Sequence, residues 1–394
     1  HIKLKSVKVI MQNIINFVIK NNIGNPPWDY YFLQNLDEKE YPRYLAKLFK
    51  LNTGENLPLK YDFKNLAWVI DKNKCRTFNQ KIQWLKLYDA TPLKRDCTDK
   101  VKVRDYVKEK IGEEYLKPVL QIIPREIHQS SHVIANVTTT TQVTCGNPAD
   151  RNTNNTNQPD HHGTVKTIVP RDDCNTYDLQ SKQYENNDVS TYFDQIQWDN
   201  LPNSFVIKCN HGCKWHFIIK NKEEYLNNPK LIDITRTKIT GWLEQEWFLW
   251  GGFELQYKNI KPKIIIEPLL RDFIEENAQE IHCYCFNSKL EFFVKLYGDI
   301  EKGICMYNKN FEQTENFFNF IERNINQNAD SNLKCAGKLS EKLANDFNFV
   351  RVDWLLFQNN LYFAEMTFTP YSGFIGIKKN WNKKLSDLTN IERI

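Results

Sequence analysis

Hydrophobic and polar positions alternate most clearly near the C-terminal end of the chain. The runs 349–354 and 361–367 are apolar at most positions and polar at regular intervals, and the polar residues 358–360 lie between them. Two such runs joined by a short polar tip predict a β-hairpin. Residues 370–373, which contain a proline and a glycine, follow the second strand.

Four polar side chains occupy positions of the same parity in this hairpin, namely Arg351, Asp353, Glu365 and Thr367. Because strand side chains alternate between faces, all four are predicted to project from one face. A cation beside two carboxylates suits a polyphosphate bound with Mg²⁺, which takes one or two carboxylates and leaves its other positions to water and phosphate. A surface hairpin with an ordinary ion pair is the alternative.

A second hairpin is predicted upstream. Residues 203–208 form an apolar run that ends at Lys208, residues 216–220 form a return strand, and the loop between them contains Gly212. Backbone N–H groups of such a loop can surround phosphate groups, and a lysine adds a point charge. The apolar run 262–270 predicts another strand, against which a flat base can dock near Glu267. Residues 99–104 open an amphipathic helix and offer Lys100.

The N-terminal region shows helical spacing instead. Residues 78–89 predict a core-facing helix. Residues 3–20 mix lysines with apolar residues, and we expect a helix packed on the domain. The alternative is a basic amphipathic helix that makes peripheral contact with a membrane.

The periodicity stops at residues 123–189, which are rich in Thr, Asn, Asp and His. Such a segment buries little apolar surface, so we expect a polar insertion on a surface loop. We read the glycosylation sequons at Asn136 and Asn154 as chance. Asp160, His161 and His162 are more typical of a solvated loop than of a metal site.

Composition limits the classes of function. The chain has 394 residues, 41% of them hydrophobic, which is enough for two or three domains. A net charge of +5 suits anionic ligands but is too diffuse to indicate nucleic acid. No apolar run approaches the roughly 20 residues of a membrane span.

Ten cysteines are scattered along the chain without a disulfide framework, which favours reduced thiols in a cytoplasmic protein. A structural zinc site is an alternative, because several ligand-type residues are close in sequence. They are Cys209, His211, Cys213, His216, His282, Cys283 and Cys285.

The order of these segments resembles the ATP-grasp superfamily: a lysine near a helix start, a lysine before a glycine loop, a strand ending in glutamate, then Arg-x-Asp and Glu-x-Thr. Within it the chain is similar to the TupA-like ATP-grasp family of teichuronopeptide and capsular polysaccharide biosynthesis. The similarity covers roughly residues 70–121 and 190–385, and includes residues 78–89.

The resemblance implies an α+β ATP-grasp fold and an ATP-dependent carboxylate–amine ligase that acts through an acyl phosphate. It implies four regions: a mainly helical part at 1–95, a small subdomain at 96–122 and 190–260, the insertion at 123–189, and a C-terminal subdomain at 261–394. The substrates would be a small-molecule or glycan-linked carboxylate, such as a uronic acid, and an amine. A non-catalytic binding protein of the same fold and a zinc-bearing scaffold are the alternatives.

The resemblance also assigns roles to residues. Arg351 and Lys208 would be catalytic, and Asp353, Glu365 and Thr367 would hold Mg²⁺. ATP would contact Lys100, Lys208, Asn210, His211, Gly212, Lys214, Glu267 and Leu270. The chain departs from the family pattern where Cys213 and Lys214 replace an expected Ser-Gly pair, which restricts the loop. Pro268 replaces a second carboxylate and removes one N–H.

Overall fold

The computed structural model describes residues 33–124, 191–270, 279–297, 303–319, 321 and 328–391. The chain divides into two compact units, one made of residues 1–125 with 178–394 and the other of residues 126–177. Every described residue lies in the first unit. The predicted helix at 3–20 and almost all of the predicted insertion lie outside the described residues.

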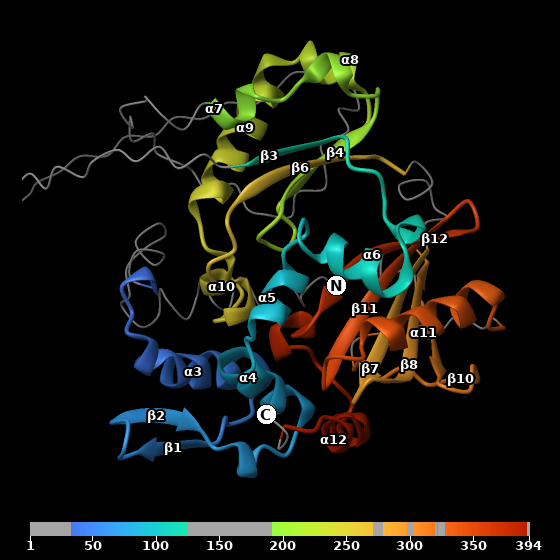
Figure 1. Ribbon diagram of the computed structural model, residues 1–394. Coiled ribbons are helices and arrows are strands. Elements are labelled where there is room, and N and C mark those ends of the chain that lie inside the picture. The colour runs from blue at the N-terminus through green and yellow to red at the C-terminus, as the bar shows by residue number, and fades with distance from the viewer. Residues whose placement is uncertain are drawn as a thin grey trace, which may run out of the picture. The chain divides into compact units, whose positions relative to one another are not determined.

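A six-stranded antiparallel sheet carries the C-terminal hairpin (Figure 1). Its strand order is β10-β9-β8-β7-β11-β12. The strands are β7 (Gln279–Phe286), β8 (Lys289–Tyr297), β9 (Ile304–Asn308), β10 (Gln313–Thr314), β11 (Phe349–Phe357) and β12 (Asn360–Thr367). The predicted hairpin is therefore present as β11 and β12, and β11 is paired on both sides.

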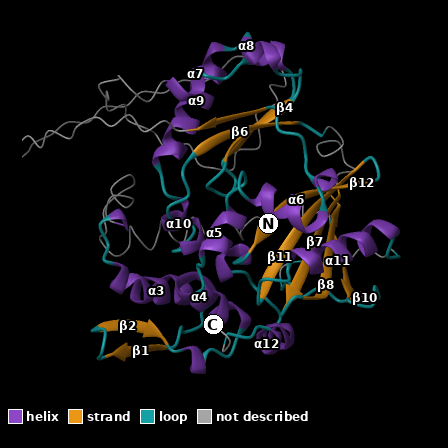
Figure 2. Ribbon diagram, in the orientation of Figure 1, coloured by secondary structure: helices purple, strands orange, loops and turns teal. Residues whose placement is uncertain are grey.

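A four-stranded antiparallel sheet carries the glycine loop. It has the order β3-β6-β4-β5, with β3 (Gln121–Pro124), β4 (Phe205–Cys209), β5 (His216–Ile219) and β6 (Lys263–Pro268). Ile123 and Pro124, which sequence reasoning placed in the insertion, belong instead to β3 and pair with Ile264 and Lys263. Figure 2 shows this sheet and the six-stranded sheet as separate groups of strands.

Ten α-helices accompany these sheets in the described residues. They are α3 (Tyr41–Thr53), α4 (Phe78–Tyr88), α5 (Pro92–Thr98), α6 (Val103–Ile111), α7 (Thr191–Asp194), α8 (Lys222–Leu226), α9 (Pro229–Glu244), α10 (Trp247–Trp250), α11 (Ser331–Leu343) and α12 (Lys379–Leu388). The predicted helix at 99–104 begins later, at Val103, so Lys100 lies in the turn before α6. The region expected to be mainly helical also contains a small sheet, β1 (Leu59–Asp62) with β2 (Ala67–Ile70).

Alternation along the strands explains how the six-stranded sheet is covered. Val350, Val352 and Trp354 pack with α11 in one buried apolar cluster, while Phe349 packs in another cluster with α4 and α12. Arg351 and Asp353 alternate with these core residues and project from the opposite face to Val350 and Val352. The third cluster lies between the four-stranded sheet and α9.

Helix α4 is fixed at its start by local chemistry. Thr77 and Gln80 form a capping box, in which each side chain binds a backbone N–H at the helix start. Asn382 of α12 accepts a further bond from the Phe78 N–H at 2.9 Å. The start of α4 is therefore fixed against α12.

Candidate active site

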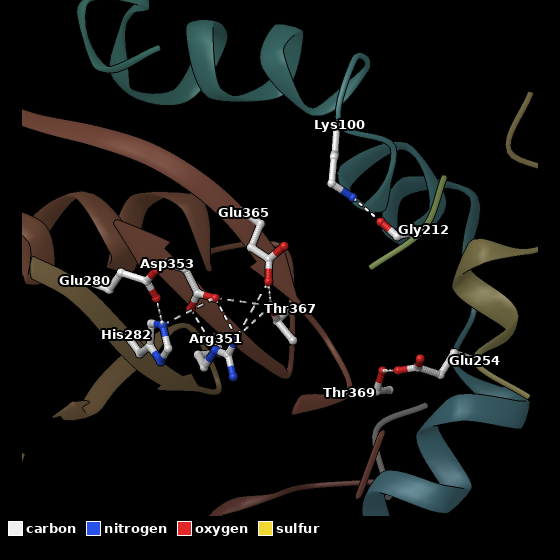
Figure 3. A network of polar contacts seen from close by, with 10 residues as sticks. All are labelled: Lys100, Gly212, Glu254, Glu280, His282, Arg351, Asp353, Glu365, Thr367 and Thr369. Carbon is white, nitrogen blue, oxygen red and sulfur yellow. Dashed lines mark hydrogen bonds and ion pairs between the residues drawn. The ribbon is translucent and has the colours of Figure 1, made fainter. Parts of the chain in front are cut away.

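The hairpin β11–β12 brings its four predicted polar residues together (Figure 3). Arg351 pairs across the strands with Thr367, and Asp353 pairs with Glu365. The Thr367 hydroxyl accepts a hydrogen bond from Arg351 at 3.3 Å and donates one to Glu365 at 3.0 Å. The register of the hairpin thus places a cation, two carboxylates and a hydroxyl within one network.

Arg351 and Asp353 form its buried centre. The guanidinium donates from Nε and Nη2 to the two oxygens of Asp353, at 2.7 and 2.6 Å. Burial alone would lower the pKa of Arg351, but Asp353 outweighs it and holds that pKa well above its ordinary value. A bidentate pair of this kind fixes the guanidinium plane as well as its charge.

Mg²⁺ is the metal that the resemblance to ATP-grasp proteins implies, and the donor set of the hairpin fits it. Glu365 lies opposite Asp353, and its side chain is 40% exposed, whereas that of Asp353 is buried. The pair therefore offers one buried and one accessible carboxylate. Two carboxylates suffice for Mg²⁺, whose remaining positions go to water and phosphate oxygens. The Thr367 hydroxyl oxygen lies 3.4 Å from an oxygen of Asp353 and 3.0 Å from an oxygen of Glu365.

Strand β7 extends this face with Glu280, which sequence reasoning missed, and with His282, which it named only as a possible zinc ligand. His282 lies beside Asp353 in the register, and its Nε2 is 3.1 Å from Glu280 and 3.9 Å from Asp353. The only signal in the sequence was the alternation of Glu280, His282 and Tyr284 along an otherwise apolar strand. Which strand lies next to β11 was not predictable from that alternation.

The glycine loop between β4 and β5 is held by Lys100, from the turn before α6. Its Nζ donates a hydrogen bond to the carbonyl of Gly212 (Figure 3). Gly212 has no room for a side chain, because an added Cβ would lie 2.3 Å from the Trp215 ring. Lys214 has a φ of 61°. The residue that replaces the expected glycine therefore adopts the left-handed conformation that glycine favours.

Asn210 and His211 were predicted to contact ATP, but their side chains are used inside the protein. The Asn210 amide donates to Asp99 and to the carbonyl of Lys261, and its Oδ1 accepts from the N–H of Lys263 at 2.7 Å. The His211 ring bonds Asn210 and the carbonyl of Trp242. Both side chains are buried, so they position the loop, and only its backbone and its outer side chains can reach a ligand.

Lys208 and Glu267 meet across the four-stranded sheet. Lys208 Nζ lies 2.7 Å from a Glu267 oxygen, and Lys117, which sequence reasoning missed, lies 3.1 Å from the same atom. Burial would raise the pKa of Glu267, but Lys208 and Lys117 outweigh it and lower that pKa to about 2. Burial, reinforced by Lys117 and opposed by Glu267, lowers the pKa of Lys208 to about 8.

This cluster has an excess of positive charge. Two lysines pair with one carboxylate, and Lys100 lies within electrostatic range of Lys208. Such a cluster suits an anionic group. Leu270, the predicted adenine contact, is half-buried just beyond β6, and the neighbouring Leu269 N–H bonds the carbonyl of Ser204 at 3.3 Å.

The loop and the metal hairpin influence each other electrostatically. Burial, reinforced by Glu365 and Glu254 and opposed by Lys100 and Lys214, raises the pKa of the Cys213 thiol to about 11. Glu254 in turn accepts a hydrogen bond from Thr369 (Figure 3). It accepts another from Trp247. The charge of Glu365 on β12 therefore acts on a side chain of the glycine loop.

The zinc alternative finds no support in the part of the chain that the structure describes. There, no group of three or more His, Cys, Asp or Glu side chains could hold a metal ion. Cys209, Cys283 and Cys285 are buried free thiols.

Among the described residues, none of the helices has the length and the apolar character that a membrane span requires.

Comparisons with known proteins show which proteins this chain is similar to. A search of curated protein sequences found no match. Among solved structures, the D-alanine–D-alanine ligase of Bacillus anthracis is 18% identical, with a TM-score of 0.26, over 43% of this chain and 45% of that one. That of Helicobacter pylori is 13% identical, with a TM-score of 0.25, over 52% and 53%.

The D-cycloserine synthetase DcsG is 10% identical, with a TM-score of 0.28, over 52% of this chain and 61% of that one. This chain thus spans about half the length of the solved structures it matches. The family model described as TupA-like ATPgrasp matches residues 161–389, more than half of the chain, and these residues include β4 to β6 and the hairpin β11–β12. The chain belongs to the TupA-like ATP-grasp family.

Proposed function

We propose that the protein is an ATP-dependent ligase that joins a carboxylate to an amine through an acyl phosphate. Characterised members of the ATP-grasp fold are ATP-dependent carbon–nitrogen ligases. The observation that carries the proposal is the face of β11–β12, where Arg351, Asp353, Glu365 and Thr367 form one network beside the lysine-bearing glycine loop.

In the first step, a carboxylate oxygen of the acceptor attacks the γ-phosphorus of ATP, the bond to the β-phosphate oxygen breaks, and ADP leaves. Such transfers depend on positioning and charge stabilisation. Lys208 and Lys100 would hold phosphate oxygens, and Arg351 would stabilise charge on the transferred group. Mg²⁺, held by Asp353 and Glu365, would neutralise further phosphate charge.

In the second step, the amine attacks the acyl carbon, inorganic phosphate leaves, and the amine releases a proton. Arg351 would stabilise the departing phosphate dianion as it stabilised the acyl phosphate. The buried setting of Arg351 strengthens both interactions, because the local dielectric is lower than that of water. Exclusion of water also protects an acyl phosphate from hydrolysis.

We propose a sugar acid, such as a uronic acid, as the carboxylate substrate, and an amino acid or amino alcohol as the amine. Family membership and the excess of lysine charge around Glu267 support an anionic substrate set. The product would be an amide-bearing sugar of a surface polysaccharide.

Hydroxylamine trapping tests the reaction, because hydroxylamine converts acyl phosphates into hydroxamates. A panel of sugar acids would be incubated with the protein, ATP, Mg²⁺ and hydroxylamine. We expect slow ADP release without an acid, and faster release with a hydroxamate for the correct acid. If no acid in a broad panel stimulates ADP release or yields a hydroxamate, carboxylate activation is rejected.

A non-catalytic ATP-grasp protein is the second candidate, and two observations favour it. Both oxygens of Asp353 are engaged by Arg351, and Lys214 stands at a loop position that favours glycine. Such a protein would bind ATP with Mg²⁺ in a calorimetric titration but release no ADP with any acid.

A further inference from the structure

A strained turn follows the metal strand. In the segment Pro370–Gly373, the φ angles of Tyr371, Ser372 and Gly373 are 54°, 53° and 67°. Only glycine adopts this left-handed region freely, and two consecutive non-glycine residues in it are unusual. Strained backbone of this kind persists only when the surrounding structure holds it, and it is concentrated at functional sites.

Helix α4 holds this turn with two buried side chains. Gln83 Nε2 donates to the carbonyls of Ser372 and Gly373, at 3.0 and 2.9 Å. Lys86 Nζ donates to the same Ser372 carbonyl at 3.1 Å and to Gln83 Oε1 at 2.9 Å. An added Cβ at Gly373 would lie 2.4 Å from Gln83, so the turn is pressed against the helix.

The turn also reaches the candidate catalytic cation. The Arg351 guanidinium lies over the Tyr371 ring, 5.5 Å from its centroid. An aromatic face attracts a guanidinium, and such contacts strengthen where water is excluded. The hairpin therefore holds Arg351 through Asp353 and Thr367, while the turn contributes the ring.

Lys86 has no part in the proposed reaction, yet the fold keeps it fully buried. Burial lowers the pKa of its amine to about 7, and Glu254 opposes this shift. A buried cation is costly unless its hydrogen bonds are satisfied. Its two protein acceptors, Gln83 and Ser372, both belong to the contact between α4 and the turn.

We propose that Gln83 and Lys86 are positioning residues for Arg351. From α4 they hold the left-handed turn at 371–373, and the turn keeps the Tyr371 ring against the guanidinium. The effect on turnover rests on the proposed ligase function, whereas the hold on the turn does not.

Lys86→Met tests the hold, since it keeps the length of the side chain and removes its donors. The probes are the amides of Ser372 and Phe374, which bond the carbonyls of Thr369 and Tyr371. By hydrogen exchange with mass spectrometry, we expect both amides to exchange at least ~10-fold faster in the variant, because the turn opens locally. If Lys86→Met fails to fold, Gln83→Leu takes its place, because it removes the hydrogen bonds from Gln83 to the carbonyls of Ser372 and Gly373.

Lys81→Met is a matched control on the same helix. Lys81 Nζ likewise donates two hydrogen bonds, but its acceptors are the backbone carbonyls of Ser386 and Thr389, at the end of α12. We expect this variant to leave exchange at 371–374 unchanged. Equal exchange in the wild type and in Lys86→Met would overturn the proposal.

ATP turnover separates positioning from mere stability. We expect Lys86→Met to lower kcat at least ~10-fold with little change in the KM for ATP, since a small misplacement of a reacting group costs rate. In a Tyr371→Ala background the same change should cost less than ~2-fold, because the two residues act in one chain. A full additional loss in that background would contradict the proposal. If the wild type turns over no ATP, the ligase proposal fails and the exchange result alone decides the hold.

Discussion

At the scale of single residues, Asp353 has two interactions to satisfy. Its two oxygens accept from Arg351, and the same carboxylate is the more buried of the two proposed Mg²⁺ ligands. Each carboxylate oxygen has a second lone pair, so a metal and a guanidinium can share the group. Glu365, which is partly exposed, is then the residue whose charge the metal needs most.

Glu365→Gln should abolish most ATP turnover without affecting folding. The change removes a metal ligand but keeps an acceptor for Thr367, and we expect a loss of at least ~10²-fold in kcat. Glu40→Gln is the control, because Glu40 is 38% exposed and also pairs with an arginine, Arg43, at 2.9 Å. Near-normal turnover in Glu365→Gln would remove Glu365 from the metal site.

The lowered pKa of the Glu267 carboxyl predicts that the stability of the protein depends on pH. Lys208 and Lys117 depress its pKa from 4.5 to about 2, so the stability it contributes is fully present above pH 4.5 and is lost as the pH falls toward 2. The shift corresponds to about 3 kcal/mol as an upper figure.

Urea unfolding of Glu267→Gln and of the wild type would measure it. We expect the free energies of unfolding to differ most at neutral pH and to converge as the pH falls below 4.5. The exposed pair of Glu315 with Lys378 supplies the control variant, Glu315→Gln. A difference between Glu267→Gln and wild type that stays constant from pH 7 to pH 3 would contradict the assignment.

Parity along the strands was enough to predict which residues of β11 and β12 share a face. It did not reveal Lys117 or Glu280, and it did not place His282 beside Asp353, because these residues enter the site through contacts between distant segments. Sequence reasoning also assigned Asn210 and His211 to the ligand, when both side chains are satisfied by protein groups. A polar residue beside a glycine loop has the same sequence signature whether it faces the ligand or supports the loop.

At the scale of elements, the loop between β4 and β5 combines two opposed constraints. The Trp215 ring leaves no room for a side chain at Gly212. The same ring stacks on Trp242, with the ring centroids 6.1 Å apart. Lys214 is exposed and carries a left-handed φ. The loop thus keeps its glycine where packing requires it and tolerates strain where solvent allows it.

Lys214→Gly should therefore stabilise the protein. Relief of the left-handed strain is expected to raise the free energy of unfolding by about 1 kcal/mol. Lys220→Gly, at an exposed position of ordinary φ just after β5, should lower it by about 0.5–1 kcal/mol through chain entropy. Denaturant unfolding of both variants compares them, and the same sign for the two changes would show that residue 214 is not strained.

Strong periodicity predicted the long elements well, including α4, β4 and the hairpin β11–β12. The hairpin β1–β2 was missed, because its four-residue strands show little alternation and its turn has an ordinary composition. The start of α6 was placed too early because lysine and valine alternate from residue 100 onward. The backbone there first forms a turn, which holds Lys100 against the glycine loop.

At the scale of the whole molecule, the family assignment and the site geometry point to the same ligand. Lys100 ties the turn before α6 to the glycine loop, and Glu365 and Glu254 act on Cys213 of that loop. Charges from three segments far apart in sequence thus converge near β12. We propose that a triphosphate lies between the lysines and the carboxylates of this face.

A crystal structure with a non-hydrolysable ATP analogue and Mg²⁺ tests this claim most directly. The account predicts phosphate oxygens within hydrogen-bond distance of Lys100 and Lys208, and a metal ion bound by Asp353 and Glu365. The same complex of Glu365→Gln should show a lower metal occupancy. A triphosphate bound elsewhere, or an ordered metal without contact to either carboxylate, would contradict the account.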